Sequence, residues 1–418
     1  MLLITGARLG QLYGRRRLYI AGVAGFTLMS LACGLAPDAG ALVAFRVAQG
    51  AATAMLIPQV MSVIQVQFTG AARARALSAY GAVLSAGAVL GMVAGGVLVS
   101  ANLLGETWRP IFLINVPLGA VLLVAVPRLV PDDRRPAIRP PGAPAGPGRA
   151  RRLDLAGLTV AAAAVCLLVL PLVLGREAGW PPWAFGCLAA GLALAAAFPA
   201  VERRVARRGD PLLNLAVLRA PGLAPGLITL ALMQAGYGGF LFFFSLHLQA
   251  APGQGGLGDS ALRAGLTYLP MTVTFGAAGM AWHRLRGQHL LPAAGMALCT
   301  LAYAAFADPA AAGGAGLTWL AWLALAAWGT GMGLAVSPLL TLALRRVPPP
   351  LTADASGVLT TTVQLSQVTG VAVFGSVFLA LAPATAFGTT SRWLAASAAL
   401  AVIPALALAR AARPRSGC

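Results

Sequence analysis

Long apolar segments recur along the whole chain and limit the folds that it can adopt. A helix crosses a hydrocarbon core of roughly 30 Å with about 20 predominantly apolar residues, which is the length of these segments. Only helix bundles and closed barrels satisfy every backbone polar group in lipid, and the segments are too continuously apolar for barrel strands. Charged residues make up 10% of the chain, against roughly 25% in globular domains. The sequence therefore predicts an all-α polytopic membrane protein.

We expect twelve membrane spans, separated by short loops that are mostly polar or basic. They lie near residues 18–37, 41–66, 76–100, 110–127, 153–174, 183–200, 223–249, 262–282, 289–307, 316–343, 355–382 and 392–411.

The loops between these spans alternate in charge. All 30 basic residues are Arg, and 25 of them lie in one alternating set of loops and in the C-terminal tail. Cytoplasmic loops carry the excess of basic residues in membrane proteins, so this set and the C-terminus are expected in the cytoplasm. The same pattern explains the net charge of +19, so no nucleic-acid partner is predicted. The Ala, Gly, Pro and Arg bias suggests a GC-rich bacterial genome, and hence the bacterial cytoplasmic (inner) membrane.

No spacing gathers the groups that covalent chemistry needs. The five Cys lack a metal-binding spacing, no phosphate-binding loop is present, and the three His have no supporting pattern. We predict that the protein is not an enzyme and that it uses no cofactor and no metal. No Asp or Glu lies in the middle of a predicted span, so the sequence names no proton-carrying carboxylate.

Two polar stretches divide the predicted spans into groups of four, two and six. The predicted regions are a four-span N-terminal bundle at 1–127, a Pro/Gly/Arg-rich cytoplasmic linker at 128–152, two extra central helices at 153–200, a basic cytoplasmic loop at 201–222, a six-helix bundle at 223–412 and a cytoplasmic tail at 413–418. Transporters are commonly built from matched six-span halves. We therefore expect the chain to begin inside a longer pattern, with two more spans before its first residue.

A short basic stretch with two glycines precedes the first predicted span. Gly10 and Gly14 allow a tight turn beside neighbouring helix ends, and the Arg side chains can interact with the carbonyl ends of helices. The residues of interest in this stretch are Arg8, Gly10, Gln11, Gly14, Arg15 and Arg16.

Arg46 lies inside the second predicted span, and Gln49 and Gly50 follow it by one helical turn. A charged side chain within a span is costly and by default marks a functional interior. The alternative is that Arg46 lies near the outer end of the span and snorkels to the interface.

Small residues recur in the third predicted span. Gly87, Gly91 and Gly95 follow one another at four-residue spacing, and Gly96 comes directly after them. Small residues on one helix face allow helices to approach closely in lipid. Ordinary helix packing uses the same pattern, so this glycine face does not define a site by itself.

Polar side chains inside other spans are further candidates. Asn115, in the Trp- and Pro-containing stretch 108–119, needs a hydrogen-bond partner in the membrane. The other candidates for a polar cavity are Gln234, His247, Gln364 and Gln367. His247 lies near a span end, where a satisfied polar or interfacial residue is the alternative interpretation.

Together these stretches resemble the major facilitator superfamily, and in particular its fourteen-span drug/proton antiporter branch. The opening stretch is similar to the family's Gly-Arg-Leu-Gly-Asp-Arg-Phe-Gly-Arg-Arg, with Gln11 in place of the Asp. Residues 46–50 match Arg-x-x-Gln-Gly, and residues 108–117 match Trp-Arg-x-Ile-Phe-x-Ile-Asn-x-Pro. The glycine face is similar to the family's antiporter motif, with Met92 where a Pro is usual.

The resemblance implies a secondary active transporter of the major facilitator fold that exports small amphiphilic drugs or metabolites by proton antiport with alternating access. It implies proton coupling at Arg46, Gln49 and Gly50, a cavity shaped by the glycine face, and a cytoplasmic gate at the opening stretch. The expected partners are a small-molecule substrate, protons and the lipid bilayer, with the chain as a monomer. Two alternatives stay open: a transporter of a nutrient or metabolite with the same fold, and a truncated, transport-inactive membrane protein.

Overall fold

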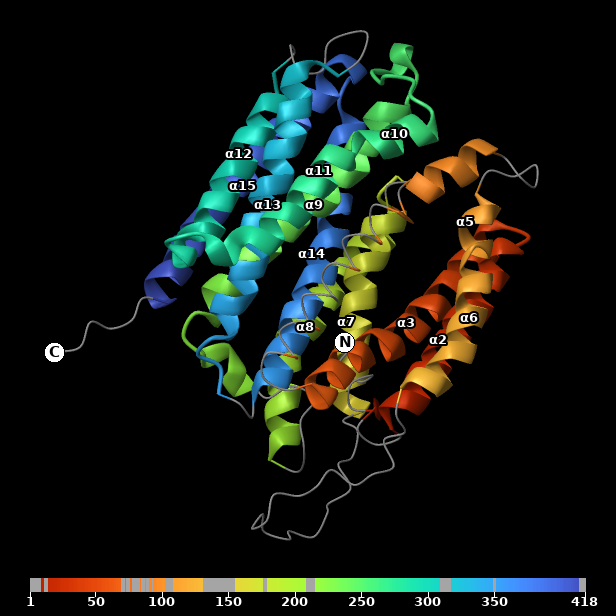
Figure 1. Cartoon of the computed structure of the whole chain (residues 1–418), viewed down its shortest axis with the longest axis vertical. Coiled ribbons are helices and arrows are strands. Elements are labelled where there is room, and N and C mark those ends of the chain that lie inside the picture. The colour runs from red at the N-terminus through yellow and green to blue at the C-terminus, as the bar shows by residue number, and fades with distance from the viewer. Residues whose placement is uncertain are drawn as a thin grey trace, which may run out of the picture. The chain divides into compact units, whose positions relative to one another are not determined.

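The computed structural model describes residues 9–10, 14–68, 72, 76, 83, 87, 90–91, 93–101, 108–130, 155–175, 179–207, 215–308, 317–348 and 351–412. Every regular element in these ranges is a helix, as the apolar segments predict (Figure 1). Contacts between residues group the chain into two compact units. The first unit contains Met1–Gly81, Val97–Ala162 and Ala197–Leu213, and the second contains Ala82–Gly96, Ala163–Ala196 and Asn214–Cys418.

The first unit is organised around α2, the helix Arg15–Gly34. It packs against α3 (Ala39–Gln67), α5 (Arg109–Leu113) and α6 (Asn115–Leu129). The α3 helix begins at Asp38, whose carboxylate accepts a hydrogen bond of 2.8 Å from the Ala41 amide and so caps the helix.

The predicted span 110–127 is interrupted in the structure. It forms α5 and α6, with a turn at Ile114 between them. Pro117 explains the interruption, because its ring nitrogen cannot donate to the carbonyl of residue 113 and its ring crowds that carbonyl. The apolar character of the segment continues across the turn, so the two helices together are long enough to cross a membrane.

The second unit contains a bundle of long helices. Its elements from residue 215 onward are η1 (Leu215–Arg219), α9 (Leu223–Gln249), η2 (Pro252–Gln254), α10 (Ala261–Thr267), α11 (Leu269–Ala281), η3 (Trp282–Arg284), η4 (Gln288–Leu290), α12 (Leu291–Phe306), α13 (Trp319–Leu344), α14 (Thr352–Ala380) and α15 (Pro383–Ala412). The α9 helix packs against α13, α14 and α15, and α12 packs against α13 and α15. Two further helices, α7 (Leu155–Leu174) and α8 (Pro182–Ala206), contribute residues to both units.

Aromatic side chains form the core of this bundle. Phe240 on α9 lies at the centre, with its ring stacked on Phe244 at 5.0 Å and tilted against Trp328 of α13 at 5.2 Å. Phe306 and Tyr303 of α12 and Phe243 of α9 also lie against the Phe240 ring. Burial of large rings at these distances contributes a substantial share of the packing energy between helices.

The α9 and α14 helices approach each other closely at glycines. A Cβ atom at Gly370 on α14 would collide with the Ala235 backbone, and one at Gly238 on α9 would collide with the Gln367 backbone. Only glycine allows the two backbones to lie at this separation, a device that is common between helices in membranes.

Nine helices in the described ranges are long and apolar enough to cross a membrane, against twelve predicted spans. Of the other three, the span 76–100 is described only in part, and 153–174 appears as α7 with a shorter apolar stretch, Gly157–Leu172. The span 262–282 is divided into α10 and α11 at Tyr268, where Pro270 removes a backbone donor from the following turn. In addition, α15 begins at Pro383, well before the predicted start at 392.

Candidate functional site

Arg46 of the first unit is held by two partners from different helices. Its Nη1 donates a hydrogen bond of 2.9 Å to Oε1 of Gln49, one turn further along α3. Its guanidinium carbon also lies 5.4 Å from the centre of the Phe112 ring on α5. A planar guanidinium near an aromatic ring gains a cation–π attraction. The predicted pair Arg46 and Gln49 is therefore brought together, with an aromatic partner added.

The segment that carries Phe112 is attached to α2 by hydrogen bonds. Ser30 donates to the Phe112 carbonyl at 2.9 Å, and the Asn115 amide donates to the Ser30 hydroxyl at 3.1 Å. A Cβ atom at Gly34 would collide with Leu113, so α5 packs closely on α2 at this level. Asn115 thus has the partner that its membrane position requires, and that partner positions the backbone of Phe112.

The chemistry of Arg46 follows from its side chain. Its guanidinium supplies a positive charge and N–H donors arranged in a planar group. Gln49 is 2% exposed, and its amide Nε2 has no hydrogen-bond partner among the described residues. The site therefore combines a fixed charge with a buried neutral donor. Gly50 is exposed, and no described atom outside its immediate neighbours lies within 4 Å of its Cβ position.

The opening stretch is described in part. Arg8 and Gln11 lie outside the described residues. Gly10 is buried against Gln59, and a Cβ atom there would collide with the Gln59 side chain. Gly14 has a φ of 92°, a conformation that favours glycine, directly before α2 begins. Arg16 donates a hydrogen bond to the Pro127 carbonyl of α6. Arg15 forms the first residue of α2.

The glycine face is only partly in contact with the described structure. Gly87 and Gly91 are exposed and Gly95 is half-buried, and a Cβ atom at any of them meets no described atom within 4 Å. Gly96 is buried, and its Cβ atom would lie 2.9 Å from the backbone of Leu262. Close packing in the second unit therefore involves Gly96, whereas the other three glycines have no described neighbour at the Cβ position.

The predicted polar residues of the later spans do not form one cluster. Gln234 on α9 is buried, Gln364 on α14 is exposed, and Gln367 is half-buried with its backbone against Gly238. His247 lies elsewhere, near the last turn of α9.

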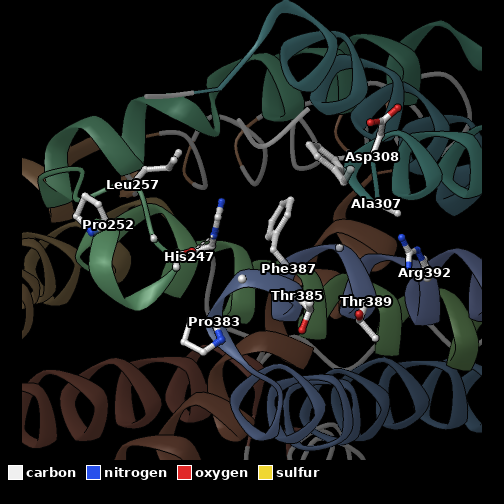
Figure 2. A pocket seen from close by; sticks show the side chains of 15 residues that line it. His247, Pro252, Leu257, Ala307, Asp308, Pro383, Thr385, Phe387, Thr389 and Arg392 are labelled. Carbon is white, nitrogen blue, oxygen red and sulfur yellow. Dashed lines mark hydrogen bonds between the residues drawn. The ribbon is translucent and has the colours of Figure 1, made fainter. Parts of the chain in front are cut away.

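His247 lines a pocket of about 350 Å³ in the second unit (Figure 2). Its Nδ1 lies 2.8 Å from the Gly255 carbonyl, in the loop that follows α9, and its ring stacks on Phe387 of α15 at 4.1 Å. Leu257 and Pro383 contribute apolar walls, and Asp308 and Arg392 lie among the lining residues. The sequence predicted His247 as a polar candidate but did not indicate its partners. Gly255 lies in the loop directly after α9, and Phe387 lies on a helix far along the chain.

No described group of three or more His, Cys, Asp or Glu side chains could hold a metal ion. The residues around Arg46 and His247 instead offer hydrogen bonds, aromatic faces and one fixed charge, which are suited to binding small molecules.

Comparisons with known proteins agree on one family. The family model described as Major Facilitator Superfamily matches residues 1–371. The chain is 36% identical to the probable actinorhodin transporter of Streptomyces coelicolor over 392 residues, which cover 91% of this chain and 64% of the relative. It is 33% identical to the cephamycin export protein CmcT of Amycolatopsis lactamdurans, with coverage of 89% and 73%. The chain thus spans less than two thirds of the length of the first relative.

A solved structure supports the same fold. The crystal structure of the peptide transporter POT in complex with sulfate is similar to this chain with a TM-score of 0.63 and 16% sequence identity. The similarity covers 98% of this chain and 84% of the other. At this identity the likeness concerns the fold alone.

Proposed function

This chain belongs to the major facilitator superfamily, and we propose that it exports small amphiphilic molecules across the bacterial cytoplasmic membrane in exchange for protons. The two relatives, named as an actinorhodin transporter and a cephamycin export protein, support export as the direction and antibiotic-like molecules as the substrate class. Both come from bacteria, which supports the cytoplasmic membrane as the location. The predicted all-α fold of the superfamily is confirmed by the family match and by the helices described above.

The observation that carries the proton-coupling part of the proposal is the arrangement around Arg46. The guanidinium of Arg46, an exposed residue, is hydrogen-bonded to Gln49 and lies near the Phe112 ring. Beside this charge, a proton and a cationic substrate bound together would place three positive charges near one another, so occupancy by one opposes occupancy by the other. Competition of this kind couples the release of one to the binding of the other. Arg46 therefore acts on the energetics of proton binding and is not itself the carrier.

The remaining parts of the mechanism follow from membership in the superfamily. Transporters of this fold work largely by rocking one helical bundle against the other around a midplane site. We place the opening stretch, including Gly10, Gly14 and Arg16, at the cytoplasmic gate, and the glycine face along the transport cavity. The C-terminus lies in the cytoplasm in this proposal, because the basic loops are expected there. The chain acts as a monomer, and its partners are the substrate, protons and lipid.

The test is a flux measurement with purified protein in liposomes. Vesicles are loaded with ethidium, a cationic amphiphilic dye, and a proton gradient is imposed in either direction. We expect dye flux that follows the proton gradient and stops when a protonophore is added. Flux that is unaffected by the gradient would contradict proton antiport, and no flux with any of a panel of amphiphilic drugs would contradict export. A panel of sugars and amino acids, tested in the same vesicles, distinguishes a nutrient transporter.

A further inference from the structure

The pocket around His247 takes no part in the coupling mechanism proposed for Arg46. It is lined by the end of α9, the loop that follows it, the end of α12 and the first turns of α15, all within the second unit. Figure 2 shows the His247 and Phe387 side chains beside each other, extending from their helices into the space that the lining residues surround. The chemistry of these side chains allows the ligand class to be inferred.

The hydrogen bonding of His247 leaves one ring atom unused. A carbonyl oxygen only accepts, so the 2.8 Å contact with Gly255 requires that Nδ1 carries a proton and donates. In the neutral ring Nε2 is then an acceptor. The residue is 5% exposed, and Nε2 is buried with no hydrogen-bond partner among the described residues. Buried polar atoms in native structures nearly always have partners, so this atom is a candidate acceptor for a donor that a ligand supplies.

The walls of the pocket suit an aromatic ligand. Phe387 and Phe306 contribute rings, and Leu257 and Pro383 contribute aliphatic surface. The lining includes one carboxylate, Asp308, and one guanidinium, Arg392, so charge at the pocket favours neither a net anion nor a net cation. Its volume of about 350 Å³ lies at the small end of known ligand pockets, which hold roughly 300 to 1,000 Å³. A molecule of one or two rings fits this size.

We propose that this pocket binds a neutral aromatic molecule bearing a hydroxyl or amino group, and that this group donates a hydrogen bond to Nε2 of His247. The proposal goes beyond the export function, because binding here requires neither a proton gradient nor movement of the helices.

The ligand comparison that tests this needs no substitution. Equilibrium binding of 2-naphthol and of 2-methoxynaphthalene is measured with the full chain in lipid nanodiscs, with empty nanodiscs as the reference for partitioning into lipid. The two molecules share an aromatic frame, but only 2-naphthol can donate. We expect 2-naphthol to bind about tenfold more tightly or better, because a buried acceptor discriminates against a ligand that cannot satisfy it. Equal saturable affinity for the two, or no saturable binding of either, would overturn the proposal.

His247→Asn separates the role of Nε2 from that of Nδ1. The Asn amide nitrogen can take the place of Nδ1 and donate to Gly255, but no atom replaces Nε2. We expect the variant to bind both ligands alike, within about twofold. The matched control is His289→Asn, because His289 lies in η4, outside the pocket, and this variant should retain the preference for 2-naphthol. If His247→Asn still bound 2-naphthol more tightly than 2-methoxynaphthalene, Nε2 of His247 would not be the acceptor for the ligand's hydroxyl group.

A third variant locates the binding without touching the buried core. Ala384 is exposed and lines the pocket, so Ala384→Phe should fill the space and leave folding intact. We expect both ligands to bind about tenfold more weakly or not at all. If Ala384→Phe bound both as the wild type does, the ligands would occupy another place and the proposal would fail, even if His247→Asn did not fold.

Discussion

The Arg46 site and the His247 pocket differ in how they are assembled. Arg46 is bound by Gln49 on its own helix and by Phe112 of a short stretch that resembles a family motif. His247 is bound by Gly255 of a neighbouring loop and by Phe387, which lies 140 positions further along the chain. Local spacing therefore marks the pair Arg46 and Gln49 in the sequence, whereas the contact between His247 and Phe387 exists only because distant helices pack together. The two units also differ in their contacts. Side-chain hydrogen bonds connect α2 to α5 and α6 in the first unit, and aromatic rings pack together in the core of the second.

Removing the charge at Arg46 should have the largest effect on transport. Hydrogen bonds to charged groups are worth roughly 1.5 to 3 kcal/mol, so Arg46→Ala should lower proton-driven efflux about tenfold or more. Efflux of ethidium from preloaded cells measures this. Arg46→Lys keeps the charge but loses the planar group that contacts both Gln49 and Phe112. Its efflux should lie between that of the wild-type protein and that of Arg46→Ala. The control is Arg286→Ala in the loop after α11, where we expect normal efflux.

Adding a methyl group at the close contact between α9 and α14 should have the largest effect on stability. Gly370→Ala places a methyl group against the Ala235 backbone, and overpacking of this kind costs roughly 1 to 3 kcal/mol. The thermal unfolding midpoint of the purified protein should fall accordingly.

The matched control for this substitution is Gly87→Ala, where no described atom lies within 4 Å of the Cβ position. It should leave stability unchanged or slightly raised, since Ala favours helix more than Gly does. Equal destabilisation by the two substitutions would remove the distinction between tightly packed and open glycines.

The hydrogen bonds that position the Phe112 backbone should contribute less to stability than the close contact at Gly370 does. Ser30 is fully buried and bonded to both the Phe112 carbonyl and the Asn115 amide. Ser30→Ala should therefore lower the free energy of unfolding by about 1 kcal/mol. Ser391 in the second unit is equally buried but has no hydrogen-bond partner among the described residues, so Ser391→Ala should cost nothing. Unfolding of the two variants in a series of detergent concentrations measures these free energies. An equal loss of unfolding free energy in Ser30→Ala and Ser391→Ala would contradict the proposed network.

Replacing Phe112, the aromatic partner of Arg46, should have the smallest effect on efflux. Phe112→Leu keeps the apolar volume but loses the ring, and exposed cation–π contacts are worth roughly 0.5 to 1 kcal/mol. Efflux should fall about two- to fivefold, and Phe112→Tyr should retain it. If Leu and Tyr at this position behaved alike, packing and not the ring would explain the contact.

Residue spacing predicted most of the helices, because an apolar stretch of membrane length has few alternatives. It missed the breaks at Ile114 and Tyr268, although Pro117 and Pro270 mark both positions in the sequence. It placed the start of α15 too late, because residues 383–391 include several Thr and Ser and look like a loop. In the structure this polar segment is the first part of the helix and lines the His247 pocket.

The sites were predictable to different degrees. The pair Arg46 and Gln49 follows from helical spacing, since residues three positions apart lie on one face. Phe112 belongs to a recognised motif, but nothing in the sequence connects it to Arg46. No local signal identifies Phe387 as a partner of His247, because that contact arises from the packing of α9 and α15, whereas Gly255 lies only 8 positions after His247 in the loop that follows α9. The predicted division of the chain into six regions stays a prediction.

The most direct test of proton-coupled export measures both movements in the same vesicles. Liposomes containing the purified protein and an internal pH indicator are given an outwardly directed ethidium gradient with no initial pH difference. We predict that protons move opposite to the dye in the wild-type protein, and that this counterflow disappears in Arg46→Ala. Dye flux without any proton movement, or counterflow of equal size in Arg46→Ala, would contradict the account.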